Sequence, residues 1–180
     1  MATKTYEQWW EIINTRCLSI FIEKIKDYGS PWLIMRLPSM TDQIFIKANR
    51  IRTIQELKEQ KIDDGVDSEY IGIINYCIMA LIKISNPDLK TDVSKNDIVQ
   101  LYHQEAKKVS DLLEAKNHDY GEAWRQMREM SFTDLILMKL LRIKQIENNN
   151  GKTSVSEGVE AGYQDIINYS VFALIKRSEN

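Results

Sequence analysis

Hydrophobic residues recur every three or four positions along most of the chain, and strand-like alternation with a period of two is absent. This spacing places apolar side chains on one face of an α-helix. Glycine, proline and asparagine clusters interrupt the pattern where loops are needed. The pattern predicts an all-α protein with helices over residues 6–26, 41–60, 64–84, 95–117, 133–149 and 157–177.

The chain contains two copies of one sequence unit. The motif Asp-Tyr-Gly at residues 27–29 recurs 92 residues later at 119–121. After a one-residue insertion, Ile-Ile-Asn-Tyr at 73–76 recurs 93 residues later at 166–169. A register kept over this length indicates an internal duplication. We therefore predict a helical bundle of two tandem three-helix repeats with pseudo-two-fold symmetry, which pack as one domain and span residues 1–88 and 89–180.

Helix-start signals support two of these boundaries. Ser94 with Asp97, and Ser154 with Glu157, have the spacing of a capping box. In that motif the serine side chain accepts a hydrogen bond from the backbone three residues on, and the acidic side chain bonds back to the cap. We expect helices to begin after Ser94 and Ser154.

The composition is that of a globular protein, with 43% hydrophobic residues, 28% charged residues and a formal net charge of −2 over 180 residues. The charge balance gives no strong nucleic-acid signal. We expect no contact with a membrane, because no apolar run reaches the length of a span and the N-terminus does not resemble a signal peptide. Cys17 and Cys77 lack disulfide or metal-ligand spacing, which favours buried thiols and a cytoplasmic location.

Two cations lie within the most apolar helix, at residues 133–149. Its hydrophobic side chains are spread around nearly the whole circumference, which predicts a central, buried helix. Lys139 and Arg142 are three residues apart and therefore share one face. The first repeat has the same pair at Lys47 and Arg50. Buried cations require an anion, which is either a carboxylate of the protein or a bound phosphate.

The last helix supplies candidate carboxylates. At 100° per residue, Glu157, Glu160, Asp165 and Asn168 fall on one stripe. Carboxylates beside a phosphate chain can hold Mg²⁺, which neutralises phosphate oxygens and activates water, whereas the alternative is a solvated acidic face. We take Glu157, Glu160 and Asp165 as catalytic and metal-ligating candidates, and we expect Arg142 to pair with Asp165, Glu157 or a bound anion.

The two repeats differ in this acidic set. Gly72 stands where the second repeat has Asp165, while the other two acids are present as Asp64 and Asp67. The first repeat is therefore the degenerate one and the second has the fuller acid set. A single composite site between the repeats is the alternative.

A loop motif, Lys-x-x-Asp-Tyr-Gly-x-x-Trp, follows the first helix of the second repeat. Gly121 can adopt a positive φ and end that helix. One interpretation is a turn held by aromatic packing. In the other, Tyr120 and Trp124 contact a base while Lys116 and Asp119 face its phosphates or a metal.

This motif, followed by Lys-x-x-Arg on a helix, an acidic helix start and Asp-Ile-Ile-Asn-Tyr, resembles the nucleotide modification associated domain 1 family. The resemblance covers residues 109–178 and, more weakly, residues 17–85. The order of motifs is also similar to the all-α nucleotide pyrophosphatases, the MazG and dimeric dUTPase group. In that group, carboxylates on bundle helices bind Mg²⁺, and water attacks a nucleoside triphosphate to release pyrophosphate.

The resemblance implies a nucleotide or other phosphate ligand and Mg²⁺ held by Glu157, Glu160 and Asp165. The pyrophosphatase signature is incomplete, because Gly162 stands three residues before Asp165 where that group has Glu. Two hypotheses follow: a Mg²⁺-dependent nucleoside triphosphate pyrophosphatase linked to nucleotide modification or pool control, and a non-catalytic nucleotide- or protein-binding module. A homodimer is one option for the assembly. From the residues and the resemblance together, the candidate ligand-binding residues are Lys116, Asp119, Tyr120, Trp124, Lys139, Arg142 and Asn168.

Overall fold

A computed structural model describes residues 4–57, 65–153 and 158–180 of the chain. Within these ranges the protein is helical and contains no strand, which confirms the predicted all-α fold. The predicted boundaries hold to within a few residues, except that the helices predicted from 41 and 133 begin four residues earlier. The α-helices are α1 (Lys4–Glu11), α2 (Leu18–Tyr28), α3 (Leu37–Leu57), α4 (Val66–Ser85), α5 (Lys95–Tyr120), α6 (Glu129–Asn148) and α7 (Val159–Glu179).

Three short helical segments complete the chain path. The π-helical η1 (Ile12–Cys17) joins α1 to α2, so one continuous rod stands where a single helix was predicted. The 3₁₀ turns η2 (Pro31–Ile34) and η3 (Ala123–Gln126) occupy the predicted loops. Gly29 and Gly121 precede these turns with φ of 71° and 62°, a conformation that glycine adopts without strain and that ends the helix before it.

The start of α5 agrees with its sequence signal. Ser94 is the N-cap, and its hydroxyl oxygen accepts a hydrogen bond of 3.1 Å from the backbone N–H of Asp97. This bond satisfies one of the donors that the first helical turn leaves without an intrahelical partner. The second predicted capping box, Ser154 with Glu157, lies outside the described residues.

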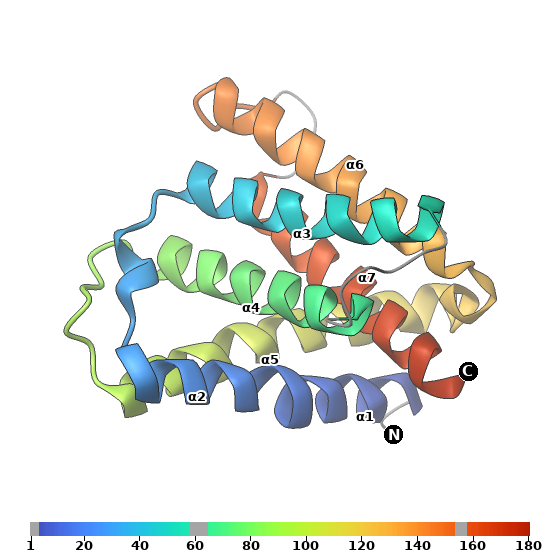
Figure 1. The fold of residues 1–180 in the computed structure, drawn as a ribbon, viewed down its shortest axis with the longest axis horizontal. Helices are drawn as coiled ribbons and strands as arrows, with labels where there is room; N and C mark the ends of the chain where they lie inside the picture. The colour runs from blue at the N-terminus through green and yellow to red at the C-terminus, as the bar shows by residue number, and fades with distance from the viewer. Residues whose placement is uncertain (1–3, 58–64, 154–157) are drawn as a thin grey trace.

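The helices form three layers, with α4 and α7 crossing in the centre, α3 and α6 on one side, and α1, α2 and α5 on the other (Figure 1). One hydrophobic core contains residues of both repeats, and it includes the thiols of Cys17 and Cys77, which are buried and free as predicted. The prediction that the helix near 133–149 is central was wrong. Met138 and Leu141 on α6 are 53% and 60% exposed, whereas α4 and α7 are covered on both sides.

Equivalent contacts in the two repeats show their common architecture. The Lys83 ammonium donates to the backbone carbonyl of Leu33 at 2.6 Å, and the Lys176 ammonium donates to that of Arg125 at 2.8 Å. Both lysines and both acceptors are related by the repeat offset. In each repeat the bond ties the last helix to the 3₁₀ turn, so the duplication seen in the sequence is also present in the tertiary contacts.

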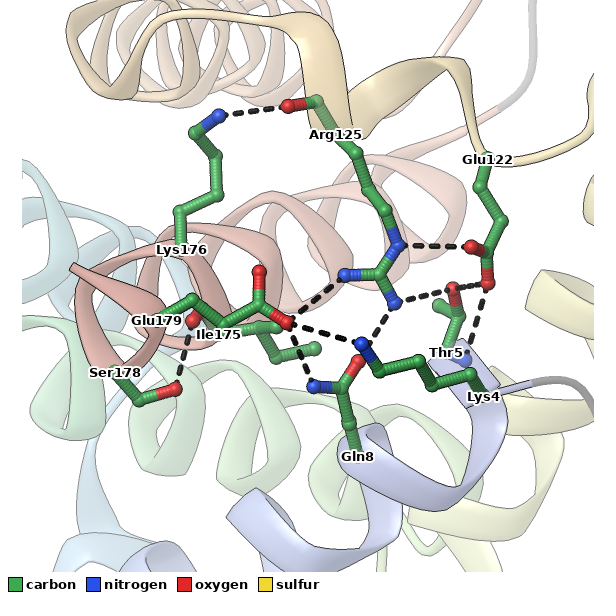
Figure 2. Close-up of polar contacts among 9 residues, drawn as sticks. All are labelled: Lys4, Thr5, Gln8, Glu122, Arg125, Ile175, Lys176, Ser178 and Glu179. Carbon is green, nitrogen blue, oxygen red and sulfur yellow. Dashed lines mark hydrogen bonds and ion pairs between the residues drawn. The ribbon is translucent and has the colours of Figure 1, made fainter.

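The two ends of the described chain meet in a polar cluster (Figure 2). The Arg125 guanidinium donates to Glu122, Glu179, Thr5 and Gln8. These partners belong to η3 or its flank, to α7 and to α1. One side chain therefore fastens α1 to the second repeat.

Candidate functional site

In the second repeat, one carboxylate lies between two lysines. Oδ1 of Asp165 accepts from Lys116 Nζ at 2.9 Å, and Oδ2 lies 2.9 Å from Lys139 Nζ. The Asp165 side chain is 13% exposed. Burial raises its pKa, but hydrogen bonds from Lys139 and Lys116 outweigh that effect and hold the pKa below its ordinary value. This trio brings together three of the residues singled out in the sequence.

The other acidic candidates do not join Asp165. Glu160 is exposed in the first turn of α7, and Glu157 lies outside the described residues. Asp64 of the first repeat also lies outside them, while Asp67 forms ion pairs with Arg16 and Arg177. Within the part of the chain that the structure describes, no three acidic, histidine or cysteine side chains are grouped so that they could hold a metal ion.

The two aromatic residues of the loop motif lie in different environments. Tyr120 is 79% exposed at the end of α5, next to the exposed Asp119. Trp124 is only 6% exposed and stacks against Phe172 with ring centroids 4.3 Å apart and planes 6° apart. The guanidinium of Arg125 also lies over its ring, 4.5 Å from the centroid. The Trp124 ring is therefore occupied by internal packing.

Asn168 and Arg142 complete the predicted set. Asn168 is buried, and its side-chain oxygen accepts a 3.0 Å hydrogen bond from the Trp9 indole, so it links α7 to α1. Arg142 is half-buried and lines a recess with Lys139 and Asp165. That recess measures about 10 Å³, which holds no more than one water molecule. Beside these charges of the second repeat, the described residues therefore leave no room for a nucleotide-sized ligand.

The first repeat contains a cavity of about 560 Å³ instead. Its wall is formed by α2, η2, α3 and α4, with Ile25, Trp32 and Met79 among the apolar residues. Its polar lining consists of Lys24, Tyr28, Lys47, Ser68, Glu69, Asn75 and Tyr76. A volume of this size falls within the range of small-molecule sites in proteins.

The residues around this cavity are the counterparts of the site predicted in the second repeat. Lys24 and Lys47 correspond to Lys116 and Lys139, and Gly72 corresponds to Asp165. The remaining correspondences are Tyr28 with Tyr120, Trp32 with Trp124, and Asn75 with Asn168. The motif of the duplicated unit therefore surrounds an open cavity in the first repeat and a filled space in the second.

Side-chain differences explain why the described residues enclose a cavity in the first repeat and fill the equivalent space in the second. Met79 lines the cavity, whereas its counterpart Phe172 stacks on the tryptophan of the second repeat. At the other end, Gly72 supplies no side chain, whereas Asp165 draws two lysines together. The ring of Phe172 and the carboxylate of Asp165 thus fill the space in the second repeat that is a cavity in the first.

Glu69 is a site residue that the sequence reasoning missed. It is 13% exposed on α4, and Arg50 Nη1 lies 2.5 Å from Oε1 while Lys47 Nζ lies 3.8 Å from Oε2. The repeat offset aligns Glu69 with Gly162, just as it aligns Gly72 with Asp165. Each repeat thus retains a different member of an acidic pair spaced by three residues. The missing acid at Gly162 was the signal: the equivalent position of the first repeat, found with the repeat offset, is Glu69.

A comparison with known families agrees with this correspondence. The sequence profile described as nucleotide modification associated domain 1 matches the chain twice, over residues 24–84 and 116–176. The chain belongs to this family. Both copies of the domain begin at a site lysine, Lys24 in the first and Lys116 in the second. Two copies of the nucleotide modification associated domain 1 therefore account for the tandem repeat.

Other comparisons add no further relatives. Neither the curated proteins nor the solved structures gave a significant match to this member of the nucleotide modification associated domain 1 family. Over the residues that the structure describes, none of its helices is both long and apolar enough to cross a membrane.

Proposed function

We propose that the protein binds a nucleotide in the cavity of the first repeat and that the second repeat serves as its structural support. The observation that carries this proposal is the position of the cavity of about 560 Å³, which is surrounded by the first-repeat copy of the family motif. The family description associates this domain with nucleotide modification.

The lining of the cavity has the chemistry that a nucleotide requires. Phe21, Ile25, Trp32 and Met79 offer an apolar wall for a base, while the lysines at 24 and 47 offer positive charge. Sites for small ligands combine such apolar walls with a few polar groups that fix orientation. The side chain of Asn75 is already engaged, because it donates to the Cys17 carbonyl and accepts from Tyr102. Its role is to hold the wall in place.

Binding accounts for the geometry better than hydrolysis does. A Mg²⁺-dependent pyrophosphatase centred on Asp165, Glu157 and Glu160 would require Asp165 to exchange two lysine ion pairs for the metal. The two ammonium groups also repel a divalent cation at that point. In the first repeat, the one described acid in the cavity wall, Glu69, is held by Arg50 and Lys47. The described residues therefore do not fit a Mg²⁺ centre, and we derive no catalytic step through one.

The proposal also covers the location, the assembly and the ligand class of the protein. Two free thiols, both buried, are compatible with a reducing cytoplasm. A homodimer is compatible with this site as long as the partner chain does not cover the residues that line the cavity, among them Tyr28, which is 58% exposed. The nucleotide rather than a nucleic acid is the expected ligand, because the chain carries a formal net charge of −2.

The test places in the first repeat the residue that the second repeat has at the equivalent position. We expect Met79→Phe to fill the cavity wall and weaken nucleotide binding at least tenfold, while Met79→Leu, which keeps a similar volume, preserves it. Binding is measured by calorimetric titration of the whole protein with ribo- and deoxynucleoside mono- and triphosphates. Thermal melts establish that both variants are folded. Equal binding by the parent protein and Met79→Phe, or no binding of any nucleotide by the parent, would contradict the proposal.

A further inference from the structure

The second repeat provides an internal picture of how an anion sits between the two site lysines. Each oxygen of the Asp165 carboxylate contacts one ammonium group, Lys116 on one side and Lys139 on the other, both at 2.9 Å. The arrangement is largely sheltered from water, since the Asp165 side chain is 13% exposed. Charge-assisted hydrogen bonds of this kind are the strong ones in proteins.

The first repeat keeps both lysines and lacks the carboxylate. Lys24 and Lys47 line the cavity, and Gly72 takes the place of Asp165 on α4. A Cβ atom at Gly72 would lie 3.0 Å from Cδ and Cε of Lys47 and 3.2 Å from its Nζ. The ammonium of Lys47 therefore lies against the helix backbone at the point where the second repeat has its acidic side chain.

Glu69 does not replace the missing anion. It is located one helical turn before Gly72, and its shorter ion pair is with Arg50, at 2.5 Å against 3.8 Å to Lys47. Among the described residues, Lys24 has no carboxylate within ion-pair distance, whereas its counterpart Lys116 is paired with Asp165. Lys24 and Lys47 thus line the same cavity, and the described residues give Lys24 no carboxylate partner there.

From this comparison we infer that the end of the cavity formed by Lys24, Lys47 and Gly72 is a subsite for a phosphate group of the ligand. The phosphate takes the position that the Asp165 carboxylate occupies in the second repeat, with one oxygen toward each lysine. Gly72 contributes no carboxylate at this point, and the flexible end of the Lys47 side chain, which lies against Gly72, turns away to admit the phosphate. This inference rests on the proposed nucleotide site and specifies which end of the cavity receives the phosphate.

The two repeats then form a matched pair. The same lysine pair is neutralised by a built-in carboxylate in one repeat and by a ligand in the other, because a single position is Asp or Gly. Introducing a carboxylate at Gly72 should convert the first repeat to the internally neutralised state. The Lys47 side chain can move to accommodate it, since the close atoms are the far end of a flexible chain.

The experiment compares Gly72→Asp with Gly72→Asn, which has nearly the same shape and no charge. The probes are the four deoxynucleosides and their 5′-monophosphates, titrated calorimetrically into the whole protein. The parent should bind a monophosphate at least tenfold more tightly than its nucleoside. Gly72→Asp should lose this preference and still bind the nucleoside, while Gly72→Asn should retain the preference.

Two results would overturn the subsite without affecting the proposed cavity. One is equal affinity of the parent for nucleoside and monophosphate. The other is the same loss of preference in Gly72→Asn as in Gly72→Asp, which would make the effect steric. Absence of binding by every probe would instead reject the nucleotide site itself.

An independent arm uses the second repeat and inorganic phosphate alone. Asp165→Gly removes the internal carboxylate and leaves Lys116 and Lys139 without it. Phosphate should then raise the melting temperature of this variant more than that of the parent at matched ionic strength. Sulfate serves as a second oxyanion, and chloride as the control. An equal shift in the two proteins would show that the lysine pair does not recognise an oxyanion.

Discussion

The hydroxyl of Tyr70 lies 3.0 Å from that of Thr133. The same contact occurs with the repeats exchanged, since the hydroxyl of Tyr163 lies 2.6 Å from that of Thr41. Each tyrosine is in the central layer and reaches a threonine of the other repeat's outer helix. These reciprocal bonds are buried, so the two repeats are joined by polar contacts with defined geometry as well as by the shared core.

Removal of either tyrosine hydroxyl should weaken the fold by a similar amount. We expect Tyr70→Phe and Tyr163→Phe each to lower the free energy of unfolding by about 1 kcal/mol, the usual net value of one buried hydrogen bond. Chemical denaturation measures this change. Tyr120→Phe, at a side chain that is 79% exposed, serves as the control for losing a hydroxyl. A loss of stability in only one of the two variants would contradict the symmetric interface.

The next prediction concerns Glu147, whose carboxylate accepts a 2.7 Å hydrogen bond from Thr41. Burial and the nearby Asp42 raise its pKa, against the opposing effects of Thr41 and Lys144. A carboxyl group with a raised folded-state pKa stabilises the fold fully below its ordinary value of 4.5, and that contribution is lost as pH rises through the folded-state pKa. At pH 7 the ionised group is therefore unfavourable.

Glu147→Gln should consequently melt at a higher temperature than the parent at pH 7. The amide oxygen can still accept from Thr41, so the hydrogen bond is kept. The difference between the two proteins should disappear as pH falls below about 4.5. Melting curves at pH 7 and pH 4 test this, with Glu114→Gln, an exposed acid on α5, as the control. A lower melting temperature at pH 7 would mean that the attraction between Glu147 and the charge of Lys144 outweighs burial.

Arg125 is the centre of the cluster that fastens α1 to the second repeat (Figure 2). Arg125→Ala should lower the free energy of unfolding by about 1–3 kcal/mol, because it leaves several partly buried acceptors without their donor. Arg125→Lys should not restore stability, since one ammonium cannot reproduce the guanidinium fork. Lys4→Ala removes an exposed cation that contacts the same Glu179 and should change stability little.

Hydrogen exchange locates this effect. Amide protons of α1 should exchange faster in Arg125→Ala, while those of the central α4 should keep their protection relative to the global stability. Uniform acceleration over the whole chain would show that the cluster supports the entire bundle rather than the docking of α1.

The fold could be read from the sequence because its two determinants are local. Helical periodicity and the constant repeat offset depend only on residue order, and both survive in the structure. The burial of α6 could not be read in the same way. Its circumference is apolar, yet Met138 and Leu141 face outward because α3 and α7 cover only part of it. The sequence of one helix does not reveal how many other helices will pack against it.

The location of the cavity was harder to foresee for a related reason. Attention to charged residues favours the second repeat, where Asp165 is present, over the first, where Gly72 has no side chain to suggest a role. An open space depends on what neighbouring side chains leave unfilled, and Met79 and Phe172 are both ordinary apolar residues in a sequence. Only the structure shows that Phe172 stacks on Trp124, whereas Met79 and Trp32 line a cavity.

The last prediction concerns the stability that Asp165 provides. Its folded-state pKa lies below the ordinary value of 3.8, because the lysine hydrogen bonds outweigh burial. Such a group stabilises the fold fully above its ordinary pKa, and the contribution is lost as pH falls through the folded-state value. Asp165→Asn should therefore lower the free energy of unfolding at pH 7 by about 1–3 kcal/mol, since two ammonium groups lose their charged partner.

The pH dependence separates this electrostatic role from a simple loss of packing. The difference between the parent and Asp165→Asn should be constant from pH 7 to pH 5 and should shrink below about pH 4, as the parent's own carboxylate takes up a proton. Urea denaturation at each pH measures it. Glu160→Gln, an exposed acid on the same helix, should change stability by less than about 0.5 kcal/mol throughout. A difference for Asp165→Asn that stays the same down to pH 3 would point to shape rather than charge, and the lysine pair of the second repeat would then cease to be a guide to the anion subsite of the first.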